Sequence, residues 1–384
     1  ILIRGGRVID PANNVDGGRD VLIEDGLIRA VGLDLTRLAA VMSPPLTVIE
    51  AHGLVVAPGF VDPHVHFREP GTDGETISTG VAAAVAGGYT TVCVMPNTNP
   101  AIDTNERVAW QHRRGAAASK AHVLVMGALT EGRAGKKPSD MVGMSRAGLA
   151  GVSDDGSGVQ APAVMLASMK HAADLGLTVS DHAEDSCLSG CGLIHEGEVS
   201  RRLGLPGKPA ISEWLMGERD LSLAMEAGCR LHIAHASTRQ TLELTTRAKA
   251  DHTRPQVTVE VAPHHLVFDD LRVVREDGSL DTDAKMNPPL RESQHRLALI
   301  AGIRSGHVDA IATDHAPHPA EKKALGIKDA PNGVIGLETA FSALNEVLVL
   351  RHSVPLSRLI QLLTVGPARC FGLSCGTLSV GSVA

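Results

Sequence analysis

Aromatic residues are scarce in this sequence. Phe, Trp and Tyr make up 2% of its 384 residues, whereas hydrophobic residues as a whole make up 43%. Val, Leu, Ile and Ala must therefore fill the interior, and an aliphatic core of this kind suits buried parallel strands. The chain is also longer than one hydrophobic core usually supports, which favours one large domain with a smaller companion.

Three further absences exclude classes of partner and location. The sequence has no long basic run, and its 36 basic against 43 acidic residues give a net charge of -7, so nucleic-acid binding has no electrostatic support. No apolar run approaches the roughly 20 residues that span a bilayer, and no signal peptide is visible, so we predict no membrane partner. Six cysteines are too few for a disulfide framework in a chain of this length, which favours a reducing cytoplasm.

Two common functional motifs are missing as well. No His-Glu-x-x-His sequence occurs, and residues 155–158 lack the Gly-Lys-Ser/Thr ending of a phosphate loop. Cys187 and Cys191 have no second pair of cysteines to complete a metal clip, so we interpret them as ordinary thiols. These absences argue against a zinc protease of that type and against a nucleotide-binding protein.

The first part of the chain indicates a small β module. Short apolar runs are separated by turns, and Asp25-Gly26 between two such runs is a hairpin signal. The expected strands are Ile1 to Ile3, Val8-Ile9, Val21 to Ile23, Leu27 to Val31 and Val48-Ile49.

From Leu54 onward, eight apolar runs rich in β-branched residues alternate with stretches of helical character. The predicted strands are Phe60 to His66, Thr90 to Met95, His122 to Met126, Ala150 to Asp154, Leu177 to His182, Leu231 to His235, Val257 to Ala262 and Val308 to Asp314. The predicted helices include Glu75 to Ala86, Asn105 to Ala118, Pro162 to Leu175, Glu213 to Ala227, Thr238 to Lys249 and Ser293 to Ser305. Eight βα units predict an α/β protein with a closed (β/α)8 barrel, while an open doubly wound sheet competes on strand count alone.

Polar groups at the ends of these runs favour the barrel. Every run except the third, which ends at Met126-Gly127, is closed by side chains able to bind metal or substrate. In chain order they are His64 and His66, Asn97, Asp154-Asp155, His182, His235, His264-His265 and Asp314-His315. A (β/α)8 barrel gathers the carboxyl ends of all its strands at one face, so these groups would converge there, whereas an open sheet would spread them along an edge.

His64 and His66 carry the strongest chemical signal. Successive strand side chains point to opposite faces, so two histidines two residues apart share a face. A lone strand-end histidine is more often structural, but imidazole is also the commonest ligand for zinc-like metals. The repetition of ligand-type groups at one mouth, with a carboxylate from Asp154-Asp155 able to bridge two metals, predicts a metalloenzyme.

Several motifs, in order along the chain, resemble those of type I dihydroorotases. They are Gly59 to Gly71, Met95 to Thr98, Ser153 to Gly156, Lys285 to Arg291, Ala312 to His318 and the loop Ala330 to Thr339. That family belongs to the amidohydrolase superfamily, whose barrel carries a small β-sandwich built from both chain ends. The likeness runs through essentially the whole chain.

The resemblance implies a zinc site of one or two ions per subunit. Its ligands would be His64, His66, Asp155, His182, His235 and Asp314. The family places the bridging role on the second of the two adjacent aspartates, with Asp154 as the fallback, because strand alternation cannot choose between neighbours at a strand end. Many amidohydrolases bridge with a carboxylated lysine, but no lysine closes the fourth run here.

The resemblance also implies the reaction, which is the reversible cyclisation of N-carbamoyl-L-aspartate to L-dihydroorotate in de novo pyrimidine biosynthesis. Zinc polarises the carbonyl and activates a water as hydroxide, while Asp314 acts as the catalytic proton shuttle. An N-cap is the structural alternative for Asp314. Substrate contacts are implied for Arg68, Asn97, Asn287, His318, Asn332 and Gly333. Taken separately, the asparagines are equally typical of turns and the arginine of a surface ion pair.

The expected domains follow the family. Residues 1–54 begin the β-sandwich, residues 55–372 form the hydrolase barrel, and residues 373–384 begin the return to the sandwich. The family normally continues with several more strands, so we expect a companion domain that is incomplete at the C-terminus, with both ends of the chain trimmed. Such a domain would expose unpaired edges and apolar surface.

Two rival functions remain open. Another cyclic amidase, a hydantoinase or an allantoinase, would share the barrel and the metals, although Arg68 and the missing bridging lysine argue against it. A metal-free scaffold subunit of aspartate transcarbamoylase would have lost several ligands, whereas all six positions are filled here. We expect a homo-oligomer, such as a dimer, with aspartate transcarbamoylase as a possible partner.

Overall fold

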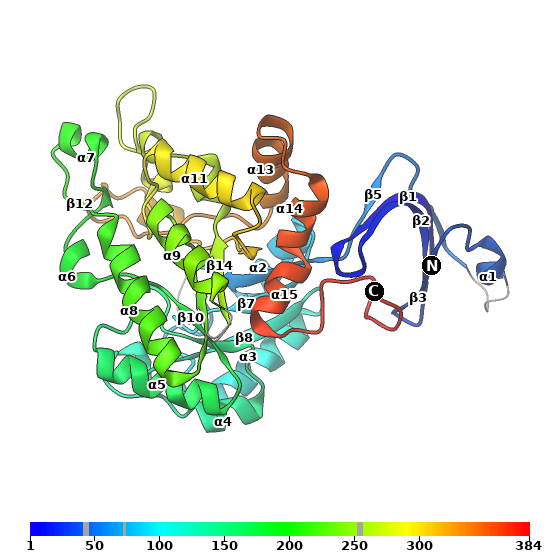
Figure 1. The fold of residues 1–384 in the computed structure, drawn as a ribbon, viewed down its shortest axis with the longest axis horizontal. Helices are drawn as coiled ribbons and strands as arrows, with labels where there is room; N and C mark the ends of the chain where they lie inside the picture. The colour runs from blue at the N-terminus through cyan, green and yellow to red at the C-terminus, as the bar shows by residue number, and fades with distance from the viewer. Residues whose placement is uncertain (41–45, 72–73, 252–255) are drawn as a thin grey trace.

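The computed structural model describes residues 1–40, 46–71, 74–251 and 256–384. Its larger part is a barrel of eight parallel strands, seen on the left in Figure 1. The strands are β6 (Phe60–Val65), β7 (Tyr89–Val94), β8 (His122–Ala128), β9 (Gly151–Ser153), β10 (Thr178–Asp181), β13 (Arg230–Ile233), β14 (Val257–Val261) and β15 (Ala310–Ile311). They pair in sequence order, and a parallel bridge between Val65 and His315 joins the last strand region to the first. The predicted (β/α)8 architecture is confirmed, and the open sheet is wrong.

Helices surround these strands (Figure 1). The six predicted ones are confirmed as α2 (Ile77–Ala86), α3 (Asn105–Ala118), α5 (Pro162–Asp174), α8 (Ile211–Ala227), α9 (Arg239–Ala250) and α11 (Ser293–Arg304). The sequence prediction did not include α4 (Met141–Ala147), α13 (Ala340–Leu344), a π-helical turn at Asn345–Arg351, α14 (Leu356–Leu363) and α15 (Val365–Phe371). These segments have five to eight residues each, too few for helical periodicity to stand out.

Short helices and strands lie in the loops that follow the carboxyl ends of the barrel strands. They are α6 (Ser186–Ser189), β11 (Ile194–His195), α7 (Glu198–Leu203), β12 (Gly207–Lys208), α10 (Pro263–Val267) and α12 (Ala320–Lys323), with 3-10 turns at Glu131–Arg133, Asp270–Val273 and Thr282–Ala284. The barrel core beneath them is mainly aliphatic, as the composition predicts, and is filled by Val, Leu, Ile, Ala and Met side chains. Among the described residues, no helix combines the length and apolar composition that a membrane span requires. All six cysteines are free thiols.

The N-terminal segment folds as a separate five-stranded sheet. Its strands are β1 (Leu2–Asp10), β2 (Val15–Glu24), β3 (Leu27–Gly32), β4 (Val48–Glu50) and β5 (Val55–Val56), with a 3-10 turn at Pro11–Asn13 and the short helix α1 (Thr36–Ala40). Asp25 and Gly26 form the predicted hairpin turn with φ of 52° and 75°, the backbone that such a turn requires. The prediction of separate strands at Ile1 to Ile3 and Val8-Ile9 is wrong. Leu2, Ile3, Val8 and Ile9 all belong to the single strand β1, whose pairing with β2 shifts register between Ile3 and Gly6.

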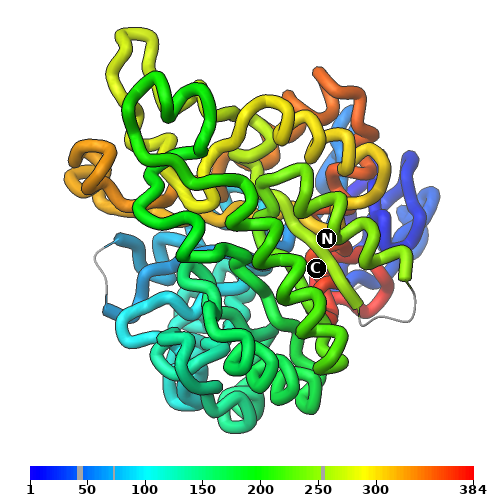
Figure 2. The backbone as a smooth tube through the Cα atoms, turned by 60° about the vertical axis from the view of Figure 1, so that its left-hand side comes forward, coloured from blue at the N-terminus to red at the C-terminus, as the bar shows by residue number. Residues whose placement is uncertain are grey.

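The C-terminal segment lies against this sheet. The amide of Ile28 donates to the carbonyl of Ser382 at 2.8 Å, and the amide of Gly381 donates to the carbonyl of Ile28 at 2.8 Å. Leu378 packs with Val8, Val21 and Ile28. Figures 1 and 2 both place the two termini close together beside the blue strands. The two ends of the sequence therefore meet in one module at the side of the barrel.

Candidate metal centre and substrate pocket

The barrel brings six distant side chains together at the carboxyl ends of its strands. His64 lies in β6 and His66 just beyond it, while the other four follow the ends of β9, β10, β13 and β15. They are His64, His66, Asp155, His182, His235 and Asp314, and all six are buried. These are the six residues that the family resemblance implies as metal ligands.

Asp155 lies at the centre of this cluster. Its Oδ1 is 3.3 Å from Nε2 of His64 and 3.2 Å from Nε2 of His235, and 3.4 Å from Nδ1 of His182. Its Oδ2 is 3.5 Å from Nε2 of His66. Two groups of three residues could each hold a metal ion, one with His64 and His66 and the other with His182 and His235, and both include Asp155. Asp155 is the carboxylate that the two groups share, as a residue that bridges two metal ions would be.

Asp154 has a different role from its neighbour. Its Oδ1 accepts hydrogen bonds from the amides of Leu129 at 2.9 Å and Thr130 at 3.0 Å, and its Oδ2 accepts one from the Thr130 hydroxyl. The carboxylate therefore ties the end of β9 to the loop after β8. Of the two aspartates between which strand alternation could not choose, it is Asp155 that faces the histidines.

Asp314 completes the cluster from the eighth strand. Its Oδ1 lies 2.9 Å from Nε2 of His66 and 3.6 Å from Nε2 of His64. Asp314 and His235 have φ of 48° and 31°, in the left-handed region that non-glycine residues rarely adopt. Strained backbone of this kind persists where the surroundings hold it and gathers at functional sites.

Acceptor groups behind three of the histidines fix their ring orientation. Nδ1 of His64 lies 2.9 Å from Oε1 of Glu260, Nδ1 of His66 lies 2.8 Å from Oδ1 of Asn97, and Nε2 of His182 lies 3.2 Å from Oε2 of Glu184. Each histidine donates an N–H to its acceptor, so in the neutral ring the other nitrogen presents a lone pair to the cluster around Asp155. Nε2 of His64 is buried without a hydrogen-bond partner. Lone pairs and carboxylates facing one another fit a cation.

The pKa values of His182 and Asp155 indicate the same demand for positive charge. Burial opposes a charge on His182, but the Asp155 and Glu184 carboxylates outweigh it and raise the pKa of His182 to about 10. Burial favours the neutral form of Asp155, yet the charge of His64 and hydrogen bonds from His182 and His235 hold its pKa well below the usual range. The carboxylates therefore stay ionised. Without a metal ion, protons on the imidazoles balance their negative charge, and a bound divalent cation would balance it instead.

A cavity of about 290 Å³ opens beside the cluster. His66, Asp155, His182 and Asp314 line this cavity. So do all the residues predicted to contact substrate, which are Arg68, Asn97, Asn287, His318, Asn332 and Gly333. Nε of Arg68 donates to the carbonyl of Pro317 at 3.2 Å, and its Nη2 lies 3.3 Å from Nε2 of His318. Burial and the neighbouring Arg68 lower the pKa of His318 to about 4, so this imidazole is neutral at physiological pH.

Asn287 lines the cavity, but its amide is already engaged. Its Nδ2 donates to Oε2 of Glu184 at 2.7 Å, and its Oδ1 accepts from Nζ of Lys208 at 2.7 Å. Lys208 also donates to Oε1 of Glu184 at 2.6 Å. These three side chains form a connected network behind His182. The sequence analysis missed Glu184 and Lys208. The two-residue spacing from His182 could have indicated Glu184, whereas Lys208 lies in β12, a strand of two residues that is too short to give a sequence signal.

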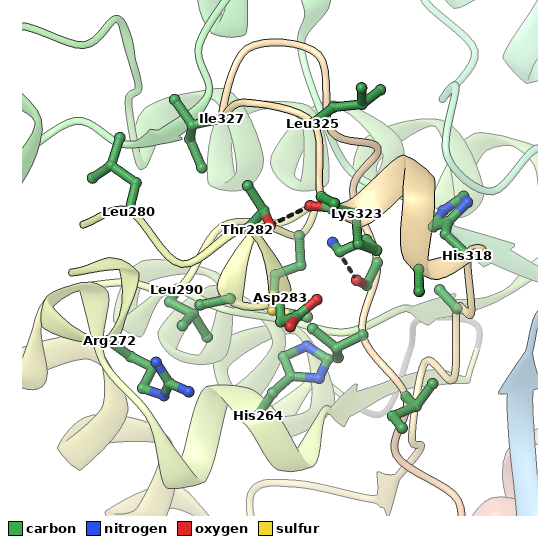
Figure 3. A pocket seen from close by; sticks show the side chains of 18 of the residues that line it. His264, Arg272, Leu280, Thr282, Asp283, Leu290, His318, Lys323, Leu325 and Ile327 are labelled. Carbon is green, nitrogen blue, oxygen red and sulfur yellow. Dashed lines mark hydrogen bonds between the residues drawn. The ribbon is translucent and has the colours of Figure 1, made fainter. Parts of the chain in front are cut away.

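A second, larger cavity of about 960 Å³ adjoins the first and is shown in Figure 3. Met286, Ala316, His318 and Gly333 line both cavities. Nζ of Lys323 donates to the carbonyls of Pro331 at 3.0 Å and Gly333 at 2.9 Å, which fixes the loop that carries Asn332. This buried lysine is a further positioning group that no sequence pattern indicated.

The paired histidines after β14 stay outside the two ion groups. His264 lies on the wall of the larger cavity, as Figure 3 shows, and its Nε2 is buried without a hydrogen-bond partner. Nε2 of His265 donates to the carbonyl of Pro288 at 3.0 Å. His265 therefore connects the end of the seventh strand to the loop that carries Asn287.

Comparisons with known proteins indicate the family. A family model described as Dihydro-orotase-like matches residues 53–241. A dihydroorotase from Elusimicrobium minutum is 42% identical over 382 residues, covering 99% of this chain and 86% of that protein. One from Brevibacillus brevis is 42% identical over 386 residues, covering 100% of this chain and 88% of that protein. The chain belongs to the dihydroorotase family.

Solved structures share the architecture of this family member. An L-hydantoinase (dihydropyrimidinase) from Arthrobacter aurescens matches with a TM-score of 0.84 at 25% sequence identity, covering 100% of this chain and 85% of that one. A D-hydantoinase (dihydropyrimidinase) from a Thermus species matches with a TM-score of 0.81 at 25% identity, covering 100% of this chain and 84% of that one. The hydantoinase rival thus shares the fold, while the curated relatives with the higher identity are dihydroorotases.

Proposed function

We propose that this protein is a metal-dependent dihydroorotase that interconverts N-carbamoyl-L-aspartate and L-dihydroorotate. The observation that carries the proposal is the pair of ion groups sharing Asp155, directly beside a cavity that Arg68 and Asn97 line. A cyclic amide that bears a carboxylate suits such a cavity, because an arginine can grip the carboxylate while the amide carbonyl faces the ions.

We propose one or two zinc ions as the resident metal. Imidazole and carboxylate ligands suit zinc. The ligands would be His64, His66, Asp155, His182, His235 and Asp314, with Asp155 shared between both ions. A bound ion would polarise the substrate carbonyl and lower the pKa of a water molecule from 15.7 to about 7.

Asp314 is proposed to move the proton. It lines the cavity and is buried, and its Oδ1 lies 2.9 Å from Nε2 of His66. Although burial favours the neutral acid, the His66 contact and the charge of His64 hold the pKa of Asp314 below the usual range, so the carboxylate is ionised and able to accept a proton. In hydrolysis it takes a proton from the attacking water and delivers it to the departing ring nitrogen. Cyclisation reverses these transfers.

The carboxylate of the substrate is proposed to bind between Arg68 and Asn97. Oδ1 of Asn97 accepts from His66, so its Nδ2 is the donor that can meet the substrate. His318 is neutral and supplies hydrogen bonding rather than charge. Asn332 and Gly333 would contact the ring from the loop that Lys323 holds.

The proposed function is tested by comparing substrates. We expect hydrolysis of L-dihydroorotate to be much faster than hydrolysis of hydantoin or allantoin, since only the first offers its ring carboxylate to Arg68. Removal of metal with a chelator should abolish the activity, and added zinc should restore it. Initial rates on each substrate and metal analysis of the purified protein check these outcomes.

Two results would overturn the proposal in different ways. A preference for hydantoin would identify the protein as a hydantoinase with the same centre. Purified protein that holds no zinc and turns over none of these cyclic amides would favour the scaffold alternative.

Replacement of Arg68 with Met should impair substrate binding more than turnover. Methionine retains much of the apolar length of the side chain but removes the charged donor. A hydrogen bond to a charged group contributes about 1.5–3 kcal/mol, so we expect kcat/KM for dihydroorotate to fall about 10- to 100-fold, mainly through KM. Steady-state kinetics measure this effect, and an unchanged KM would contradict the contact with the carboxylate.

The remaining assignments are proposals on the same basis. We propose the division into a module that begins with residues 1–54, a barrel of residues 55–372 and a returning segment of residues 373–384. A cytoplasmic homodimer is expected, with aspartate transcarbamoylase as a candidate partner. Size measurement of the purified protein alone and with that enzyme tests the assembly.

A further inference from the structure

Glu260 is a buried carboxylate with three donors around it. It lies in β14 beneath the histidine cluster and is 1% exposed. Its Oε1 lies 2.9 Å from Nδ1 of His64 and 3.3 Å from the backbone nitrogen of His235, and its Oε2 lies 3.0 Å from Nε2 of His232. One side chain therefore contacts one histidine from each of the two ion groups.

The carboxylate of Glu260 determines which ring nitrogen of His64 carries the proton. An ionised carboxylate only accepts hydrogen bonds, so His64 must donate from Nδ1, which leaves Nε2 of the neutral ring as a lone pair. That atom is buried, has no hydrogen-bond partner and lies 3.3 Å from Oδ1 of Asp155. Glu260 thus sets the tautomer in which His64 can bind a cation.

The same carboxylate supports His235 through its backbone. The His235 amide that donates to Glu260 belongs to a residue with φ of 31°, a conformation that costs energy for a side chain of this kind. Nε2 of His235 lies 3.2 Å from Oδ1 of Asp155. The bond to Glu260 helps to hold the strained turn from which this imidazole reaches Asp155.

A buried support fixes Glu260 itself. His232 donates from Nε2 to Glu260, so its Nδ1 accepts, and the Thr258 hydroxyl lies 2.8 Å from that atom as the donor. His232 is fully buried and Thr258 nearly so. Thr258, His232, Glu260 and His64 form a continuous hydrogen-bonded chain from the barrel interior to the cluster.

We propose that Glu260 is a positioning residue that aligns His64 and His235, and so prepares both ion sites at once. The inference rests on the proposed metal centre and goes beyond it, because Glu260 is no ligand and lies outside the cavity lining. Acceptors behind metal-binding histidines typically change metal affinity 10- to 100-fold when they are replaced. A residue shared by two sites should affect the binding of both ions.

The test replaces Glu260 with Gln, which keeps the shape but turns one acceptor into a donor. Zinc alone is titrated into the metal-stripped protein in competition with a chromophoric chelator, and urea unfolding of the same metal-free sample measures stability. We expect about 10- to 100-fold weaker zinc binding in both steps. The absorption spectrum of the cobalt(II)-substituted protein should also change, since the ligand geometry differs.

Asp281→Asn is the matched control. Asp281 is equally buried and accepts hydrogen bonds from Arg272 and Arg275, but contacts no residue of the cluster. It should lower stability without weakening zinc binding. If Glu260→Gln does not fold, Thr258→Val removes only the far end of the chain and should weaken zinc binding to a smaller extent.

The outcomes separate this inference from the proposed function. A parent protein that binds no zinc refutes the metal centre. A parent that binds zinc tightly, with Glu260→Gln equal to it in both binding steps, refutes only the role of Glu260. Where Glu260→Gln does not fold, Thr258→Val equal to the parent refutes that role. An equal loss of zinc affinity in Asp281→Asn also refutes that role, because the loss would then follow from general destabilisation.

Discussion

Asp155→Asn is expected to abolish binding of both metal ions and to lower dihydroorotase activity by at least about 10³-fold. Both oxygens of Asp155 face imidazole nitrogens, with Oδ1 within 3.4 Å of three of them and Oδ2 3.5 Å from His66. An amide has one acceptor oxygen and no charge, so it cannot bridge two cations. Metal ions supply several kcal/mol of transition-state stabilisation, and each 1.36 kcal/mol corresponds to a factor of ten.

Metal analysis and single-turnover rates measure this effect, and Asp154→Asn is its matched control. The neighbouring carboxylate accepts only from Leu129 and Thr130. Its replacement by an amide leaves a donor facing a buried donor, which should lower the free energy of unfolding by about 1–3 kcal/mol. The metal content should remain that of the parent. Loss of metal from Asp154→Asn with retention in Asp155→Asn would reverse the assignment of the bridge.

Asp314→Asn should fold normally and keep some metal, yet lose about 10²- to 10⁴-fold in kcat, the usual contribution of a positioned acid or base. The backbone supports this choice of substitution, because Asn is one of the few residues that readily adopt the φ of 48° found at Asp314. The amide cannot take up and release a proton at neutral pH. Steady-state kinetics together with metal analysis separate the loss of proton transfer from loss of the ion.

Asp25→Asn provides the control for backbone effects. Asp25 also has a left-handed φ, of 52°, but lies in the hairpin between β2 and β3. That variant should match the parent in kcat and metal content. Turnover like that of the parent in Asp314→Asn would refute the proton-transfer role, whatever the metal content.

The meeting of the candidate groups could be predicted from the sequence because the fold converts order along the chain into position in space, whereas the selection of six of them as ligands came from the family resemblance and stays a prediction. Each polar group that closes an apolar run arrives at the same face of the barrel, so His64, His182 and His235 needed no distance information. Strand alternation could not choose between Asp154 and Asp155, since the strand ends there. The resemblance favoured Asp155, and in the structure Asp155 is the one that faces the histidines. The curated relatives support the family independently of this geometry.

The supporting residues were harder to predict. Glu260 lies within the predicted strand Val257 to Ala262, where it is the only charged residue among apolar neighbours. A buried carboxylate needs hydrogen-bond partners, so its position could have indicated a supporting role. Lys208 and Lys323 lie in β12 and α12, elements of two and four residues that are too short to show periodicity. Their roles depend on carbonyl and side-chain positions that only the folded loops create. The short helices near the end of the chain were missed for the same lack of pattern.

The last barrel strand, β15, has two residues. The barrel closes just after it, where His315 forms a parallel bridge with Val65 of β6. His66 and Asp314 lie on the two sides of this closure, with Nε2 of His66 2.9 Å from Oδ1 of Asp314. A cation bound by both residues would link the first and last strands of the barrel. Because ligand binding stabilises the folded state by about 2.7 kcal/mol at a hundredfold excess over Kd, such an ion would also stabilise the closure of the barrel.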